Sequence, residues 1–318
     1  MAIKVNTLSE YVNIHKDELL TKAVLGANTL DHVEKMLDVK YKDQLNYLDS
    51  TVVLADGSVC GWNPQGDDTF TARTIEVVPL SVQKEFCWKD LRKYWMNEQL
   101  LFDAGKESLP FEEKFTENNI KAINAELEKQ IWMNDKTVEE GTALFDGFVK
   151  LITDAAGSHK VDLAAGYTAI DIIDKTYAAL TPIMLLQGVT IFVSHSTFRN
   201  YIQALNAVCC ANRAVIDANA DFVMYPGDSR VKIVPVTGLE GADATKVLAV
   251  ASPETNLVYA TDVDGSENDF RLWFDEKESK YLMSVLFNAG VQYKFDDQLV
   301  ITKAQAAAKA KAQAQDQK

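Results

Sequence analysis

The chain has 318 residues, 47% of them hydrophobic, so it can build a real core in one large domain or two smaller ones. Its formal net charge is −14 and its isoelectric point is about 4.8. This balance argues against a protein that grips phosphates, because nucleic-acid binding needs an excess of lysine and arginine. The start of the chain lacks the apolar centre of a signal peptide, and no apolar run approaches the roughly 20 residues that cross a bilayer.

Two segments of different character open the chain. Residues 1–48 are charged, with apolar residues such as Val33, Leu37 and Tyr41 at loose helical spacing, and predict a helical arm. Because its apolar stripe is weak, we expect the arm to be stabilised by packing against other parts of the protein or its neighbours. Residues 51–80 predict an extended hairpin around a tip rich in Gly, Pro and Asp. Because a lone hairpin is marginal in water, it must lie on its own domain or on a neighbouring subunit.

A long helix is the clearest element of the middle region. Residues 84–102 form an aromatic cluster, which predicts core or interface packing, with a ligand cage as the alternative. Residues 111–132 then predict a helix, with Glu112 and Glu113 at the positive end of its dipole. At 1.5 Å per residue this rod is roughly 30 Å long. One apolar stripe follows the helix: Ile120, Ile123, Leu127 and Ile131.

Residues 167–252 alternate between helix and strand. Thr168 and Asp171 make a capping signal for a helix that ends before Pro182. Val189–Ser194 predicts a buried strand, and Ser196 is the predicted cap of the helix after it. Two further strands are predicted: Val231–Val234 and Val247–Ala251. The pattern indicates a compact α/β unit with a central sheet.

The last third of the chain predicts strands and a tail. Period-two alternation bounded by Gly, Asp and Asn is the signature of strands and hairpins. It predicts four strands: Leu257–Thr261, Phe270–Phe274, Tyr281–Phe287, and Val291–Phe295 after Asn288–Gly290. Residues 303–318 are of low complexity, with four Lys and one Asp, and predict a frayed helix or a disordered tail.

No reactive constellation accompanies these elements. The sequence contains neither a phosphate-binding glycine loop nor a nucleophile elbow. His195, between two serines at a strand end, is interpreted as a residue beside a helix cap, with a catalytic role as the alternative. The four cysteines show no metal-binding spacing and are expected to be reduced thiols: Cys60, Cys87, Cys209 and Cys210.

Acidic residues offer the one candidate cation site. The turn Asp262–Asp269 carries Asp262, Asp264, Glu267 and Asp269, which could bind Ca²⁺ or Mg²⁺, but its glycine does not fit the calcium-loop pattern. It is interpreted as a solvated turn. The same interpretation applies to a second group: Asp217, Asp221 and Asp228. No metal or cofactor is therefore predicted.

The order of the parts resembles a known family, the major capsid protein of tailed bacteriophages. Its fold is shared by encapsulin shells and the floor of herpesvirus capsids. The segments that carry the resemblance are Val77–Leu80 with Phe86–Leu91, Glu128–Trp132, Leu144–Phe148, and Asn256–Thr261 with Phe270–Phe274. The resemblance spans roughly residues 1–301 and implies an α+β capsid fold.

The resemblance implies that successive segments of the chain form different parts of the subunit. Residues 1–48 would form the N-terminal arm and 49–80 the extended loop. Residues 81–150 and 262–301 would form the peripheral domain around a spine helix, 151–261 the axial domain, and 302–318 the tail. Six residues of the loop and spine helix would lie at assembly interfaces: Trp62, Phe70, Arg73, Ile75, Glu126 and Trp132.

The implied function is a structural protein without enzyme activity. Pentamers and hexamers would assemble in the host cytoplasm into an icosahedral virion shell around double-stranded DNA, without sequence-specific binding or a membrane. A separate scaffolding protein, a portal and decoration proteins are possible partners. The alternatives are an encapsulin-like compartment, another ring-forming virion protein, and a small α/β enzyme that uses His195.

Overall fold

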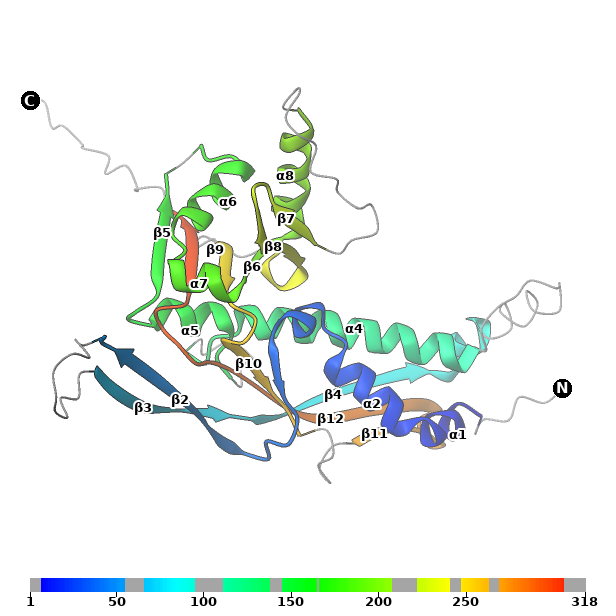
Figure 1. The fold of residues 1–318 in the computed structure, drawn as a ribbon. Helices are drawn as coiled ribbons and strands as arrows, with labels where there is room; N and C mark the ends of the chain where they lie inside the picture. The colour runs from blue at the N-terminus through cyan, green and yellow to red at the C-terminus, as the bar shows by residue number, and fades with distance from the viewer. Residues whose placement is uncertain are drawn as a thin grey trace, which may run out of the picture. The chain divides into compact units, whose positions relative to one another are not determined.

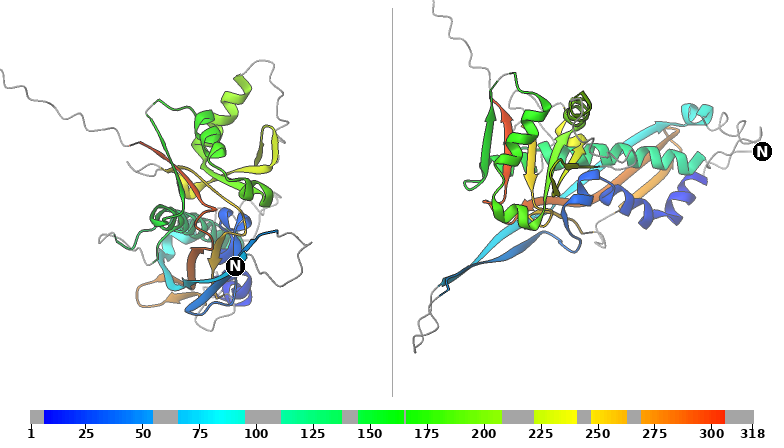
Figure 2. Two further views of the ribbon diagram at one scale, coloured as in Figure 1. Left: turned by 60° about the vertical axis from the view of Figure 1, so that its left-hand side comes forward. Right: turned by 45° about the horizontal axis from the view of Figure 1, so that its top comes forward.

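In the computed structural model, the described residues are 7–54, 66–94, 111–137, 145–164, 166–207, 222–240, 247–262 and 269–305. The chain divides into two compact units, drawn in Figure 1 and Figure 2. The first comprises Met1–Leu127, Asp135–Asp146 and Leu257–Lys294. The second comprises Glu128–Asn134, Gly147–Asn256 and Phe295–Lys318.

The first unit is built on a sheet with the strand order β1-β10-β12-β11, in which β4 also pairs with β12. Its central strand, β12, pairs with both β11 and β4 over its first part and with β10 near its end. The strands are β1 (Glu34–Met36), β4 (Val78–Cys87), β10 (Leu257–Ala260), β11 (Asp269–Asp275) and β12 (Lys280–Tyr293).

The continuity of β12 corrects one prediction. A break between Tyr281–Phe287 and Val291–Phe295 was expected at Asn288–Gly290, but β12 runs unbroken to Tyr293. Gly290 serves a close approach rather than a turn, because a Cβ there would lie 2.1 Å from the carbonyl oxygen of Glu76.

Helices cover this sheet. Helices α1 (Thr7–Ile14) and α2 (Lys16–Leu25) pack on β11, and a 3-10 turn follows at Asn28–His32. Figure 1 shows them beside α4 (Phe111–Met133). The predicted stripe of α4 is confirmed, since Ile120, Ile123, Leu127 and Ile131 are all buried. Residues 88–94 are also helical.

The hairpin consists of β2 (Lys42–Val52) and β3 (Gly66–Glu76), which form a separate two-stranded sheet. A hairpin is confirmed, but it spans Lys42–Glu76 rather than 51–80, and the helical prediction for residues 1–48 is wrong from Glu34 onward. The helix-spaced Leu37 and Tyr41 are exposed. The buried residues there instead join a small cluster that includes Val39, Leu45, Ile75, Val77 and Val258.

The second unit is built on a six-stranded sheet, ordered β5-β13-β9-β6-β8-β7. Its strands are β5 (His159–Leu163), β6 (Val189–Ser194), β7 (Val223–Tyr225), β8 (Asp228–Val236), β9 (Val247–Ser252) and β13 (Val300–Ala304). Its helices are α5 (Phe148–Asp154), α6 (Ala169–Ala178), α7 (Pro182–Gln187) and α8 (His195–Ala207). Helices α6 and α8 contact each other and the sheet, and the predicted α/β unit is confirmed.

Helix caps test the local predictions in this unit. Thr168 and Asp171 form the predicted capping box of α6. Ser196 is not the cap of α8, because Ser194 accepts the Thr197 N–H at 3.2 Å. The backbone N–H of Ser196 instead donates to Glu240 at 2.8 Å.

The predicted tail begins too early. Residues 302–304 belong to β13, and the Thr302 hydroxyl is buried at 2.7 Å from that of Thr176. The rest of the predicted tail, from residue 306, lies outside the described residues.

Candidate assembly surfaces

The hairpin exposes large apolar side chains on a sheet of only two strands. Along β3 only Ile75 is buried and only Arg73 is half-buried. Phe70 is 84% exposed, Val52 80% and Leu48 49%. Figure 2 shows the hairpin extending away from the sheet of the first unit. Two strands without a covered face are marginal in water, and clustered exposed apolar groups mark interaction surfaces.

The base of the hairpin is anchored in its own unit. Ile75 is fully buried, and the Arg73 guanidinium lies 4.0 Å from the centre of the Tyr293 ring, a cation–π contact. Gln292 donates its side-chain amide to the Thr74 carbonyl at 3.1 Å. Of the predicted interface residues of the loop, Arg73 and Ile75 therefore hold the hairpin, while Phe70 projects from it. Trp62 lies outside the described residues.

The two predicted interface residues of the spine helix, Glu126 and Trp132, also differ in their exposure. Glu126 is exposed on α4. Trp132 is fully buried and packs on Phe148 and Phe192 at centroid distances of 5.5 and 5.0 Å. A Cβ at Gly238 would lie 2.4 Å from the Trp132 ring, so glycine is required there. Trp132 therefore contributes to the core of the second unit.

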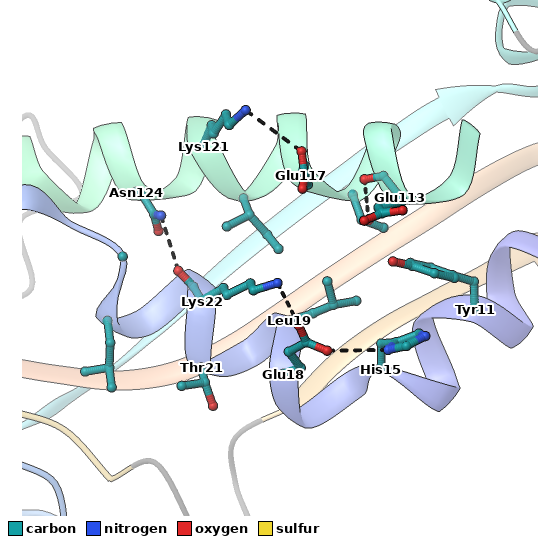
Figure 3. Close-up of a pocket in the computed structure, with 14 residues that line it drawn as sticks. Tyr11, His15, Glu18, Leu19, Thr21, Lys22, Glu113, Glu117, Lys121 and Asn124 are labelled. Atoms are coloured by element: carbon teal, nitrogen blue, oxygen red, sulfur yellow. Dashed lines mark hydrogen bonds and ion pairs between the residues drawn. The ribbon is translucent and has the colours of Figure 1, made fainter. Parts of the chain in front are cut away.

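A groove of about 690 Å³ lies between α1–α2 and α4, and we call it the arm groove (Figure 3). Its apolar lining includes Leu19, Leu25 and Ile120. The other lining residues are Tyr11, His15, Glu18, Thr21, Lys22, Gly26, Glu113, Thr116, Glu117, Lys121 and Asn124. Sequence reasoning missed it, because no local pattern reveals that α2 and α4 are neighbours.

Ion pairs and a hydrogen bond shape the walls of the arm groove. The Nζ atom of Lys22 lies 2.7 Å from the Glu18 carboxylate, and the Nζ atom of Lys121 lies 3.9 Å from the Glu117 carboxylate. The Asn124 side-chain N–H donates to the Lys22 carbonyl at 3.2 Å, across the groove (Figure 3). This contact satisfies a carbonyl in the last turn of α2 and ties the arm to α4.

The electrostatic potential in the arm groove is locally negative. Burial raises the pKa of the Tyr11 hydroxyl, and the carboxylates of Glu113 and Glu18 raise it further. The hydrogen bond and charge of Lys22 lower the pKa of Glu18, while Glu18 raises the pKa of Lys22 in return. A cationic group entering the groove would therefore be stabilised.

His195 has a carboxylate in its vicinity that the sequence did not indicate. Its ring lies 3.4 Å from the Thr237 hydroxyl. The backbone N–H of Ser196 is the main cause that lowers the pKa of Glu240, and His195 adds a smaller effect. Glu240 thus stabilises the N-terminus of α8, which agrees with the interpretation of His195 as a residue beside a helix cap.

The remaining predicted sites yield little. Of the acidic turn, 263–268 lie outside the described residues, as do Asp217 and Asp221. Within the described ranges no group of three or more His, Cys, Asp or Glu side chains is placed to hold a metal ion. None of the described helices is both long and apolar enough to span a membrane.

Comparison with known proteins shows likeness in structure alone. No family model matches the chain, and no curated protein matches it in sequence. A chain in the satellite phage P4 procapsid, which includes the size determination (Sid) protein, matches with a TM-score of 0.60 at 9% identity, over 94% of this chain and 96% of that one. The capsid of an empty GTA particle matches with a TM-score of 0.53 at 13% identity, over 88% and 90%.

The chain has a phage capsid fold. Gordonia phage Cozz supports this assignment with a TM-score of 0.53 at 14% identity, over 87% of this chain and 86% of that one. The prediction of an α+β capsid fold is therefore confirmed. At such low identities the likeness concerns the fold and not individual residues.

Proposed function

We propose that the chain is a structural major capsid protein without enzyme activity. Its pentamers and hexamers assemble into an icosahedral shell around double-stranded DNA. The observation that carries the proposal is the hairpin, whose exposed Leu48, Val52 and Phe70 need a covering surface. A chain with the capsid fold can supply that surface from another copy, and rings or shells repeat the contact around every subunit.

The proposed parts of the subunit follow the observed elements. The N-terminal arm contains α1 and α2, and the extended loop is the hairpin from Lys42 to Glu76 rather than 49–80. The peripheral domain contains α4 up to Leu127 and ends at Lys294 rather than 301, because β13 pairs with β5 and β9 in the other unit. The axial domain is the six-stranded sheet with its helices.

The interface residues of the proposal are Phe70, Glu126 and Trp62. Arg73, Ile75 and Trp132 act indirectly by holding the hairpin and the core in shape. Each contact can be modest, since a ring or shell repeats it many times. The net charge of −14 lets the shell surround DNA without binding it tightly.

The rest of the proposal concerns where the shell is assembled and which other proteins take part. The shell is assembled in the host cytoplasm and then forms part of the virion. A scaffolding protein, a portal and decoration proteins are its further partners. An encapsulin-like compartment or a ring-forming virion protein is the second candidate. Particle geometry separates them, because a ring former gives one closed ring of fixed stoichiometry.

The experiment that tests the proposal removes or alters the hairpin tip. Deletion of 55–72, and separately Phe70→Ser, should give folded subunits that sediment as small species and form no shells. Thr71→Ala, on the same exposed strand, is the matched control and should assemble normally. Circular dichroism confirms folding, and sedimentation with electron microscopy measures assembly. Normal shells from the deletion variant would overturn the proposed role of the hairpin.

A further inference from the structure

The unsatisfied groups of the arm groove are all acceptors. Both of its lysines have acidic partners, Lys22 with Glu18 and Lys121 with Glu117. Across the described part of the chain, by contrast, no cation pairs with the carboxylate of Glu113. The Asn124 side-chain oxygen is buried without a hydrogen-bond partner there. Buried polar atoms normally have hydrogen-bond partners, so a ligand with N–H donors would supply the partners that these acceptors lack.

The shape of the arm groove suits a peptide. Its volume of about 690 Å³ exceeds what one side chain fills, and its two helical walls resemble the grooves that receive peptide segments. The apolar lining, which includes Ile120 and Leu19, favours small aliphatic contacts, and Figure 3 shows Leu19 in the groove. The fitting ligand is thus a peptide with small apolar side chains, lysines and amides.

The chain contains such a segment. Residues 306–318 consist of six Ala, three Lys, three Gln and one Asp. Lys309, Lys311 and Lys318 supply ammonium groups and the glutamines supply amide N–H donors. Lys309 and Lys311 lie four and six residues beyond Gln305, so an extended chain carries them up to about 14 and 21 Å from it. This segment lacks an apolar stripe and cannot build a core of its own.

We propose that the arm groove binds residues 306–318 of a neighbouring copy of this chain. Lys309 or Lys311 pairs with Glu113, a glutamine amide donates to the Asn124 side-chain oxygen, and alanine methyl groups cover the apolar lining. Exposed ion pairs are individually weak, so a single docking event is weak, and repetition over an assembly strengthens it. This proposal is independent of the proposed capsid function, because it can be tested on any oligomer of the chain, whether or not that oligomer is a shell.

Carbodiimide cross-linking of the full-length protein tests the proposal. The reagent joins a lysine amine directly to a carboxylate in contact with it, and mass spectrometry locates the link. Links from Lys309 or Lys311 to Glu113 or Glu117 are expected. Asp17, exposed on α2 but outside the groove, is the matched control and should give none. Equal linking to Asp17, or no tail link at Glu113 and Glu117, would overturn the proposal.

Peptide competition provides a second readout. Excess synthetic peptide of residues 306–318 should suppress the links, whereas the same peptide with Lys309→Ala and Lys311→Ala should not. Suppression by both peptides, or by neither, would show that the lysines do not direct docking. Electron microscopy of the same samples records assembly separately, so a failed docking proposal is distinguished from a failed capsid proposal.

Discussion

Substitution of Asn256 should destabilise the second unit strongly. This side chain is 1% exposed and makes at least three hydrogen bonds within its unit. Its amide donates to the carbonyls of Phe295 and Gln298 at 3.1 and 3.3 Å, and its oxygen accepts the Phe295 N–H at 2.7 Å. These bonds fix the residues that lead into β13, a strand inside the six-stranded sheet.

The magnitude follows from the three bonds. Each is worth about 0.5–1.5 kcal/mol net, and a buried N–H left without a partner costs about 1–3 kcal/mol. Asn256→Ala should therefore lower the free energy of unfolding by about 2–5 kcal/mol, a large share of the stability of a typical domain. Asn200→Ala, at an exposed position of α8, is the matched control and should change it by less than about 0.5 kcal/mol.

The assay is urea unfolding of unassembled subunits, followed by tryptophan fluorescence, because Trp132 is buried in the same unit. Asn256→Asp adds a pH signature, since its second oxygen would face two carbonyl oxygens. Protonation relieves that repulsion, so the carboxyl pKa is raised in the folded state and the stability of this variant should rise as pH falls. An alanine variant within about 0.5 kcal/mol of wild type would refute this reasoning.

Two further predictions concern single residues. Gly290→Ala should lower the free energy of unfolding by about 1–3 kcal/mol, because the new methyl group would meet the Glu76 carbonyl. Ser284→Ala, on the same strand, is the control and should have little effect. Equal effects of the two substitutions in chemical denaturation would contradict the close approach. The backbone N–H and hydroxyl of Thr168 lower the pKa of Asp171, so its contribution to stability is present above the ordinary Asp pKa and is lost as pH falls through the lowered value. The difference in melting temperature between wild type and Asp171→Asn should accordingly shrink on acidification, and a constant difference would show that the capping box contributes no pH dependence.

Local patterns revealed the elements whose periodicity reflects burial. The stripe of α4 and the capping box of α6 were predictable because both depend on spacings of three or four residues. The start of β2 was not, because Leu37 and Tyr41 happen to follow helical spacing although both are exposed. The unbroken course of β12 also escaped prediction, since Gly290 marks both turns and close backbone contacts in a sequence.

The candidate surfaces were predictable only in part. The hairpin was visible as two alternating runs around a polar tip, and its need for a covering surface follows from its two strands. Sequence reasoning could not separate Phe70, which projects, from Ile75, which is buried five residues later on the same strand. The arm groove depends on the contact between Asn124 and Lys22, which are 102 residues apart, and no spacing rule reaches that far.

Electron microscopy of the purified full-length chain, combined with sedimentation and with co-expressed viral partners where needed, tests the central claim most directly. The account predicts closed shells tens of nanometres across, or isolated pentamers and hexamers, in which the hairpin of one copy is covered by another. A monomer or dimer under every condition would contradict it.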